Sequence, residues 1–250
     1  MKRRVTVALV FLLHLSVMLS TVVCLLLLAV STNAARDAHR IGRALEFRYQ
    51  HARTLKAEFY ERYSDGNGGV TAEAGTVYFS RPGRMRWEYE SPEQKLFLVD
   101  GKNVWFYVPA DHTASRAKLN ESADWRTPFS LLAGKAEFSG FCRSIRIAAP
   151  TDLPAGRPAE SPLEPGDTLL RCVPRVSSDA ADDVIRDILF ETDPVAHLVR
   201  VVVREAGNAE IEFRFGNWQE NIAIPEVKFH FQAPPGVAIV EEEKLAREAR

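Results

Sequence analysis

The segment from Gly75 to Pro109 constrains the fold of this chain more than any other stretch. Apolar and polar residues alternate through three successive runs in it. The alternation is clearest where Met85, Trp87 and Tyr89 share one parity and charged residues occupy the other. A turn signal at Asp100-Gly101 then leads into a further apolar run. A period of two residues, interrupted by turn signals, predicts antiparallel strands. Because one parity is rich in aromatic residues, we expect this sheet to wrap around something apolar.

The N-terminal end has the pattern of an export signal. Basic residues at Lys2–Arg4 precede an uncharged apolar run from Val5 to Val30, and small residues follow at Ser31–Ala35. This order predicts a signal peptide over residues 1–34, cleaved after Ala34 or Ala35. The apolar run is also long enough to span a bilayer, so an uncleaved N-terminal anchor remains an alternative. In both cases we expect the rest of the chain to be exported.

The charge balance gives no support for nucleic-acid binding. The chain has 32 basic and 33 acidic residues, a formal net charge of −1, whereas nucleic-acid-binding proteins carry a basic excess. The length that remains after the signal suits one domain with a sizeable core. We expect that domain over residues 35–240, followed by a charged tail over 241–250.

Two cysteines fall in the exported part. Cys142 and Cys172 lie in strand-like runs on either side of a Pro-rich segment, residues 149–167, which has the composition of an exposed loop. In an oxidising compartment such a pair can form a disulfide. The alternative is two separate small core residues.

The rest of the pattern predicts a mainly β chain of the α+β type. Apolar residues recur at helical spacing over 36–53, and Phe129 to Ala133 forms a short, strongly apolar helix. About ten or eleven strands are predicted in all, including Phe138–Ala148 and Val227–Gln232. No fixed repeat and no alternation of strands with helices is present. A large, strongly curved antiparallel sheet with helices covering one side fits best.

No pattern of residues indicates catalysis. The histidines beyond the signal show no metal-ligand spacing, and the chain lacks both the G-x-S-x-G elbow and the phosphate-binding loop. We therefore expect no enzyme activity and no cofactor. Arg81 stands out instead, beside the turn residues Pro82 and Gly83. Its guanidinium has five donors that could bond the carbonyls at a helix end, although an ordinary surface arginine is the alternative.

Four motifs stand in one order along the chain. They are ARTLKAEFYER after the first helix, GTVYFSRPGRMRWEYESPEQKLFLVDGKNVWFY, the Thr127-Pro128-Phe129 helix start and the ending FHFQAPPGVAIV. Together they resemble the LolA family, which are periplasmic carriers that take lipoproteins to the outer membrane. The resemblance covers roughly residues 36–240. The Pro-rich segment and the cysteine pair depart from the family pattern.

The resemblance implies a half-open β-barrel with an α-helical lid over an apolar cavity for acyl chains. It also implies that Arg81 latches the lid to the barrel. As partners it implies lipoproteins, an inner-membrane lipoprotein-releasing ABC transporter and an outer-membrane acceptor, with the carrier itself a periplasmic monomer. Plain core packing is the alternative for each residue that we expect in the cavity or lid: Met85, Trp87, Tyr89, Trp105, Phe129 and Leu132.

A second function remains open. A membrane-anchored sensor of related fold could bind lipid or lipoprotein and regulate an envelope stress response. A lipid hydrolase is disfavoured because no nucleophile constellation is present.

Overall fold

The computed structural model describes residues 36–119, 129–134, 137–153, 163–175 and 185–241. The expected signal peptide, most of the charged tail, the start of the Thr127-Pro128 helix and the centre of the Pro-rich segment lie outside these ranges. Among the described helices, none combines the length and the apolar character needed to cross a bilayer.

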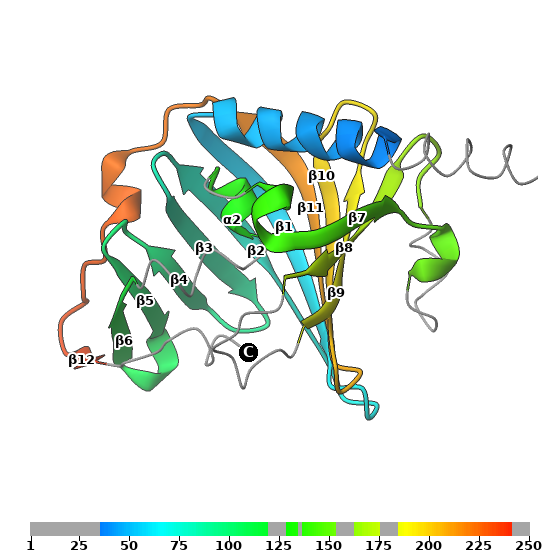
Figure 1. The fold of residues 1–250 in the computed structure, drawn as a ribbon. Helices are drawn as coiled ribbons and strands as arrows, with labels where there is room; N and C mark the ends of the chain where they lie inside the picture. Colours follow the sequence, from blue (N-terminus) through cyan, green and yellow to red (C-terminus); the bar gives the residue numbers. More distant parts are fainter. Residues whose placement is uncertain (1–35, 120–128, 135–136, 154–162, 176–184, 242–250) are drawn as a thin grey trace, which may run out of the picture.

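The described strands form one curved, open sheet (Figure 1). Neighbouring strands are antiparallel, except that β12 runs parallel to β6. The mainly β prediction is therefore confirmed, with twelve strands in place of ten or eleven. The order across the sheet is β12-β6-β5-β4-β3-β2-β1-β11-β10-β9-β8-β7. The bounds are β1 (Thr54–Ser64), β2 (Val70–Ser80), β3 (Arg84–Ser91), β4 (Lys95–Val99), β5 (Asn103–Val108), β6 (Thr113–Lys118), β7 (Cys142–Ile147), β8 (Thr168–Pro174), β9 (Ile185–Thr192), β10 (Leu198–Glu205), β11 (Glu210–Glu220) and β12 (Ala238–Glu241).

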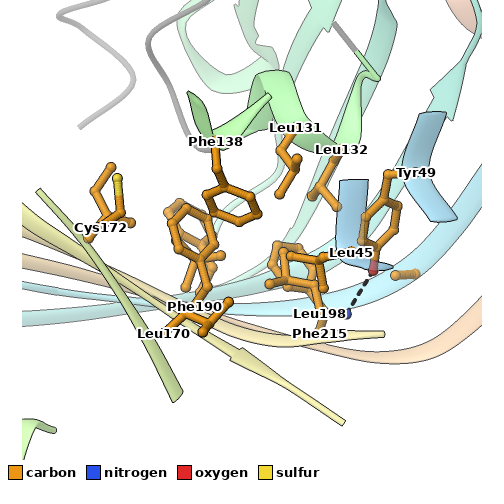
Figure 2. Close-up of a cluster of buried hydrophobic side chains, with 14 of the residues drawn as sticks. Leu45, Tyr49, Leu131, Leu132, Phe138, Leu170, Cys172, Phe190, Leu198 and Phe215 are labelled. Atoms are coloured by element: carbon orange, nitrogen blue, oxygen red, sulfur yellow. Dashed lines mark hydrogen bonds between the residues drawn. The ribbon is translucent and has the colours of Figure 1, made fainter. Parts of the chain in front are cut away.

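Three helical segments cover the concave face of this sheet. The first, residues 36–51, lies along one end of the strands, and the short helices α2 (Phe129–Leu132) and α3 (Phe138–Phe141) lie in front of them (Figure 1). The first helix buries one face, on which Ala38, Leu45 and Tyr49 are fully buried. Leu198 donates its backbone N–H to the hydroxyl of Tyr49 at 2.8 Å (Figure 2), and this bond gives the buried phenol a polar partner.

The main core lies between the concave face and these helices. Val77, Trp87 and Phe97 occupy paired positions on β2, β3 and β4, so their side chains share that face. Leu131 and Phe138 belong to the same cluster and lie on its helical side, where Figure 2 shows them among other buried side chains of the core. Burial of these apolar side chains on both sides holds the short helices in place, because helices of four residues have little stability of their own.

Two predicted strands are wrong, one in part and one entirely. Residues Phe138–Phe141 form α3, and the strand begins only at Cys142. Both phenylalanines are buried, and their spacing of three residues suits one face of a helical turn. Val227–Gln232 is not a strand either. Its first half is the 3₁₀ helix η4 (Glu226–Phe229), which packs Phe229 on the convex face of the sheet.

A disulfide joins Cys142 and Cys172, whose Cα atoms are 5.5 Å apart. It ties the residue that follows α3 to β8 within the antiparallel β7–β8 pair. A bridge between residues 30 positions apart stabilises a fold by about 3–4 kcal/mol in the chain-entropy model. The disulfide therefore fixes one end of the helical cover to the sheet.

Candidate functional site

Arg81 joins two helices at the turn between β2 and β3. Its Nε donates to the carbonyl oxygen of Ala52 at 3.1 Å, and one Nη donates to the carbonyl oxygen of Leu132 at 3.1 Å. Ala52 directly follows the helix of residues 36–51, and Leu132 ends α2. Carbonyls at helix C-terminal ends lack partners within the helix and carry partial negative charge, so a guanidinium suits them well. One side chain thus holds both helices against the sheet.

The guanidinium of Arg81 is only partly satisfied there. Burial lowers its pKa to about 10, so the group stays charged at neutral pH. Its second Nη is buried and finds no hydrogen-bond partner among the described residues. A buried donor without a partner costs about 1–3 kcal/mol, which lowers the free energy needed to open this contact. The contact can therefore open at a lower cost in free energy than a fully hydrogen-bonded one.

The absence of a side chain at Gly134 leaves room for the guanidinium of Arg81. This glycine has a φ of +66°, and a Cβ there would lie 2.1 Å from Cζ of Arg81. We therefore expect Gly134→Ala to push the guanidinium off the end of α2 and to strain the backbone. Chemical denaturation should show a loss of about 1–2 kcal/mol.

Gly140→Ala is the matched control for that substitution, because nothing lies within 4 Å of a Cβ at Gly140. It should leave stability nearly unchanged. An equally stable Gly134→Ala variant would contradict the close packing of Arg81 on this glycine.

Trp87 is the centre of an aromatic cluster between sheet and helices. Its ring centroid lies 4.8 Å from that of Phe59 and 4.8 Å from that of Phe129, both in edge-on geometry. Phe213 lies 5.6 Å away on β11. Phe129 is the first residue of α2, so the helix that Arg81 holds rests directly on the tryptophan of the concave face. Sheet and cover meet through aromatic rings.

Most of the other predicted cavity residues join this cluster. Leu132 is fully buried in it, and Met85 and Tyr89 are partly buried and pack against it. The structure therefore brings together five of the six residues that we expected in the cavity or lid.

Trp105 does not join them, so its predicted place in the cavity or lid is wrong. It pairs with Leu98, which neighbours Phe97, the partner of Trp87, so it points to the convex face. There it packs with Phe229, stacks on Phe231 at 4.7 Å, and donates from Nε1 to Asp100 at 2.9 Å. Alternation within a strand does not tell which parity faces inward after a turn, and that is why the prediction failed.

A buried carboxylate that we did not predict from the sequence lies where the apolar part of the concave face ends. Glu61 is buried, at 8% exposure, and its carboxylate accepts a hydrogen bond of 2.9 Å from the hydroxyl of Tyr89. Burial, more than the nearby charge of Glu73, raises the pKa of Glu61 to about 7. The sequence signal was available: Glu61 has the parity of Phe59 on β1, so an acid stands on the apolar side of the strand.

The buried carboxyl of Glu61 makes stability depend on pH. Its folded-state pKa lies above the ordinary value of 4.5, so the folded protein holds the proton more tightly than the unfolded chain. Stability should therefore fall as pH rises from about 4.5 to 7 and then level off. Glu61→Gln removes this cost and should be more stable than the parent by about 3 kcal/mol at pH 8. The two proteins should become equal below pH 4, as measured by urea denaturation; a difference independent of pH would contradict the assignment.

Comparisons with known proteins agree with this architecture. Residues 50–142 match the family model described as "Outer membrane lipoprotein carrier protein LolA". An outer-membrane lipoprotein carrier protein of Chromobacterium violaceum is 30% identical over 190 residues, which are 76% of this chain and 82% of the relative. One of Nitrosospira multiformis is 25% identical over 90% of this chain and 99% of its own length.

A solved structure has the same fold. An uncharacterized conserved protein from Thermus thermophilus superposes with a TM-score of 0.50 at 12% identity, over 82% of this chain and 99% of its own. Among the described residues, no group of three or more His, Cys, Asp or Glu side chains could hold a metal ion. The similarity in sequence to the carrier proteins, over most of both chains, shows that this chain belongs to the LolA family of outer-membrane lipoprotein carrier proteins.

Proposed function

We propose that this protein is a periplasmic carrier that binds the acyl chains of lipoproteins on its concave face and delivers them from the inner to the outer membrane. One observation carries the proposal: Phe129 of α2, a helix held by Arg81, rests on Trp87 at the centre of the apolar face. Such a cover can be lifted as a unit to expose aromatic surface. The relatives named as lipoprotein carriers support the same role.

Acyl chains need such a protein because water does not dissolve them. Burial of a chain gains about 0.8 kcal/mol per CH₂, so one long chain gains on the order of 10 kcal/mol when fully buried. A carrier must also release that chain. In this structure the protein's own aromatic rings lie between the sheet and the helices, and the ring centroids of Trp87 and Phe129 are 4.8 Å apart. These ring contacts compete with cargo and therefore favour release.

Arg81 sets the balance between the two states in this proposal. Cargo that enters between sheet and α2 has to separate Phe129 from Trp87, and this movement breaks the bond from Arg81 to Leu132. When cargo leaves, the ring contacts and the hydrogen bond form again. The cargo shifts the protein toward the open state only to the extent that it binds that state more tightly.

The proposed partners are those that the family resemblance implies. The chain has no nucleotide-binding motif, and in this proposal an inner-membrane lipoprotein-releasing ABC transporter supplies the energy for loading. Release runs downhill to an outer-membrane acceptor of higher affinity. The carrier works as a monomer between the two.

Depletion of the protein followed by membrane fractionation tests this function. Lipoproteins of the outer membrane should accumulate in the inner membrane when the carrier is absent. Correct sorting in a depleted cell that has no second homologue would overturn the proposal. Purified protein should also take up a fluorescent acyl chain, and the bound chain should move to acceptor vesicles.

A second function rests on the N-terminal run of uncharged residues from Val5 to Val30. If this run anchors the protein, a sensor that binds lipoprotein and regulates an envelope stress response fits better than a diffusing carrier. N-terminal sequencing of the exported protein separates the two. A start at Ala35 or Arg36 favours the carrier, and an intact N-terminus favours the anchored sensor.

A further inference from the structure

We propose that Glu61, with Tyr89 and the Glu73–Lys95 ion pair, forms a subsite for an N–H group at the polar end of an acylated cargo. The inference rests on the proposed carrier function and adds to it the part of the cargo that is recognised. An N-acylated amine or peptide is the class of ligand that fits. A lipid whose acyl chains are all esters lacks the required donor.

The concave face changes from apolar to polar along its strands. Near the first helix it carries Leu55 on β1, and Phe59 lies four residues further along the same parity. Glu61 is the next inward position, two residues beyond Phe59. On β3 the same direction leads from Met85 and Trp87 to Tyr89. A bound amphiphile with its chains on the aromatic rings would therefore place its polar end beside Glu61.

The polar residues belong to four adjacent strands. Glu61 on β1 is paired in register with Glu73 on β2, and Tyr89 on β3 with Lys95 on β4. The ring of Tyr89 packs edge-on against Phe59 at a centroid distance of 5.0 Å, so the polar group is continuous with the aromatic cluster. A ligand that touches the rings is within reach of the carboxylate.

The nearest cation is shared with another carboxylate: Lys95 acts on Glu61 only through space, since its ion pair is with Glu73. Lys95 forms an ion pair with Glu73, and that pair is neutral as a whole. Among the described residues, the hydrogen-bond donor to the buried Glu61 carboxylate is the hydroxyl of Tyr89, which is neutral. A buried carboxylate needs several hydrogen bonds or a positive partner to offset its loss of water. A carboxylate kept in such surroundings destabilises the fold, and groups of that kind are concentrated at binding sites.

The chemistry of the ligand follows from the capacity of the Glu61 carboxylate to accept further hydrogen bonds besides that from Tyr89. Its oxygens accept hydrogen bonds, so an amide or amine N–H beside the acyl chains satisfies them. An ester at the same position has no hydrogen to donate and presents oxygen lone pairs to the carboxylate. The subsite therefore selects an amide-linked chain over an ester-linked chain of equal length.

Two probes of the same fatty acid test this selection: its N-methylamide and its methyl ester. They differ by one N–H group, and binding of each is measured by displacement of a fluorescent acyl chain at pH 8. The parent protein should bind the amide about 10-fold more tightly, since a hydrogen bond to a charged group is worth at least that factor. In Glu61→Leu the ratio should fall to about 1, and in Glu61→Gln to an intermediate value, since a neutral carbonyl is the weaker acceptor.

Glu58→Gln is the matched control. Glu58 lies three residues before Glu61 on β1, is exposed, and therefore faces the other side of the sheet. It should keep the parent's ratio. Equal binding of both probes to the parent, or an unchanged ratio in Glu61→Leu, would overturn the subsite while leaving the carrier function intact. Binding of neither probe would instead count against the carrier function, so the two failures are distinguishable.

Discussion

Arg81→Leu is expected to load cargo normally and to transfer it to an acceptor about 10- to 100-fold more slowly than the parent protein. The substitution removes the two bonds from the guanidinium to Ala52 and Leu132. A hydrogen bond from a charged donor contributes about 1.5–3 kcal/mol, and in the proposed cycle the bond to Leu132 re-forms only when cargo leaves. Its loss weakens the closed state alone, so the loaded state is favoured and release is slowed.

The measurement is transfer of a fluorescent lipoprotein from the loaded carrier to acceptor vesicles. Arg143→Leu makes the same chemical change at an exposed position of β7 and should transfer at the parent rate. Arg81→Lys should resemble Arg81→Leu, because a single ammonium does not reproduce the fork that reaches both carbonyls. A parent-like transfer rate in Arg81→Leu would refute the latch.

Trp87→Ala is expected to lower the stability of the empty protein by about 3–5 kcal/mol, the usual cost of removing a large aromatic side chain from a core. The loss should be much smaller in the protein saturated with an acyl chain. In the proposed cycle, cargo replaces the indole's contacts with Phe59, Phe129 and Phe213 and fills part of the space that the indole leaves. Equilibrium denaturation with and without the bound chain measures both losses.

Leu98→Ala is the control for the tryptophan. Leu98 is also fully buried, but it belongs to the cluster on the convex face with Trp105 and Phe229. Its replacement should cost about 2–5 kcal/mol whether or not cargo is bound. If Trp87→Ala behaves in the same way, Trp87 is an ordinary core residue and the cargo lies elsewhere.

The strands of the sheet were predictable where alternation is local. Met85, Trp87 and Tyr89 share a face because side chains in a strand alternate, and no tertiary information is needed for that. Trp105 shows the limit. Its side depends on the register across the turn from Asp100 to Asn103, and both parities of β5 are apolar.

The helical parts were harder to predict for a related reason. α3 has four residues, and Phe138 and Phe141 suit a strand as well as a helical turn in a window so short. In η4, Phe229 packs on Leu98 and Trp105, so a tertiary contact decides the local conformation.

The candidate site was predictable only in part. Arg81 could be named from its turn and from the family resemblance, but its acceptors at residues 52 and 132 lie far away in the chain. Glu61 was missed because an acid within an amphipathic strand is usually taken to mark the solvent side. Its shared parity with Phe59 pointed inward, and the pairing with Phe213 and Glu73 shows this directly. The role of Gly134 was not predictable, because its close approach to Arg81 is a tertiary feature.

The parallel pairing of β12 with β6 has a consequence for biogenesis. The two strands lie more than a hundred residues apart in the chain, Ala238 opposite Thr113, and among the described strands β12 is synthesised last. Until it docks, the outer side of β6 is a free edge with unpaired N–H and C=O groups, a surface on which other chains can add. Contacts between distant segments also form slowly. A newly exported chain therefore passes through a period in which the edge of its sheet can associate with other chains, and deletion of β12 would leave that edge unpaired.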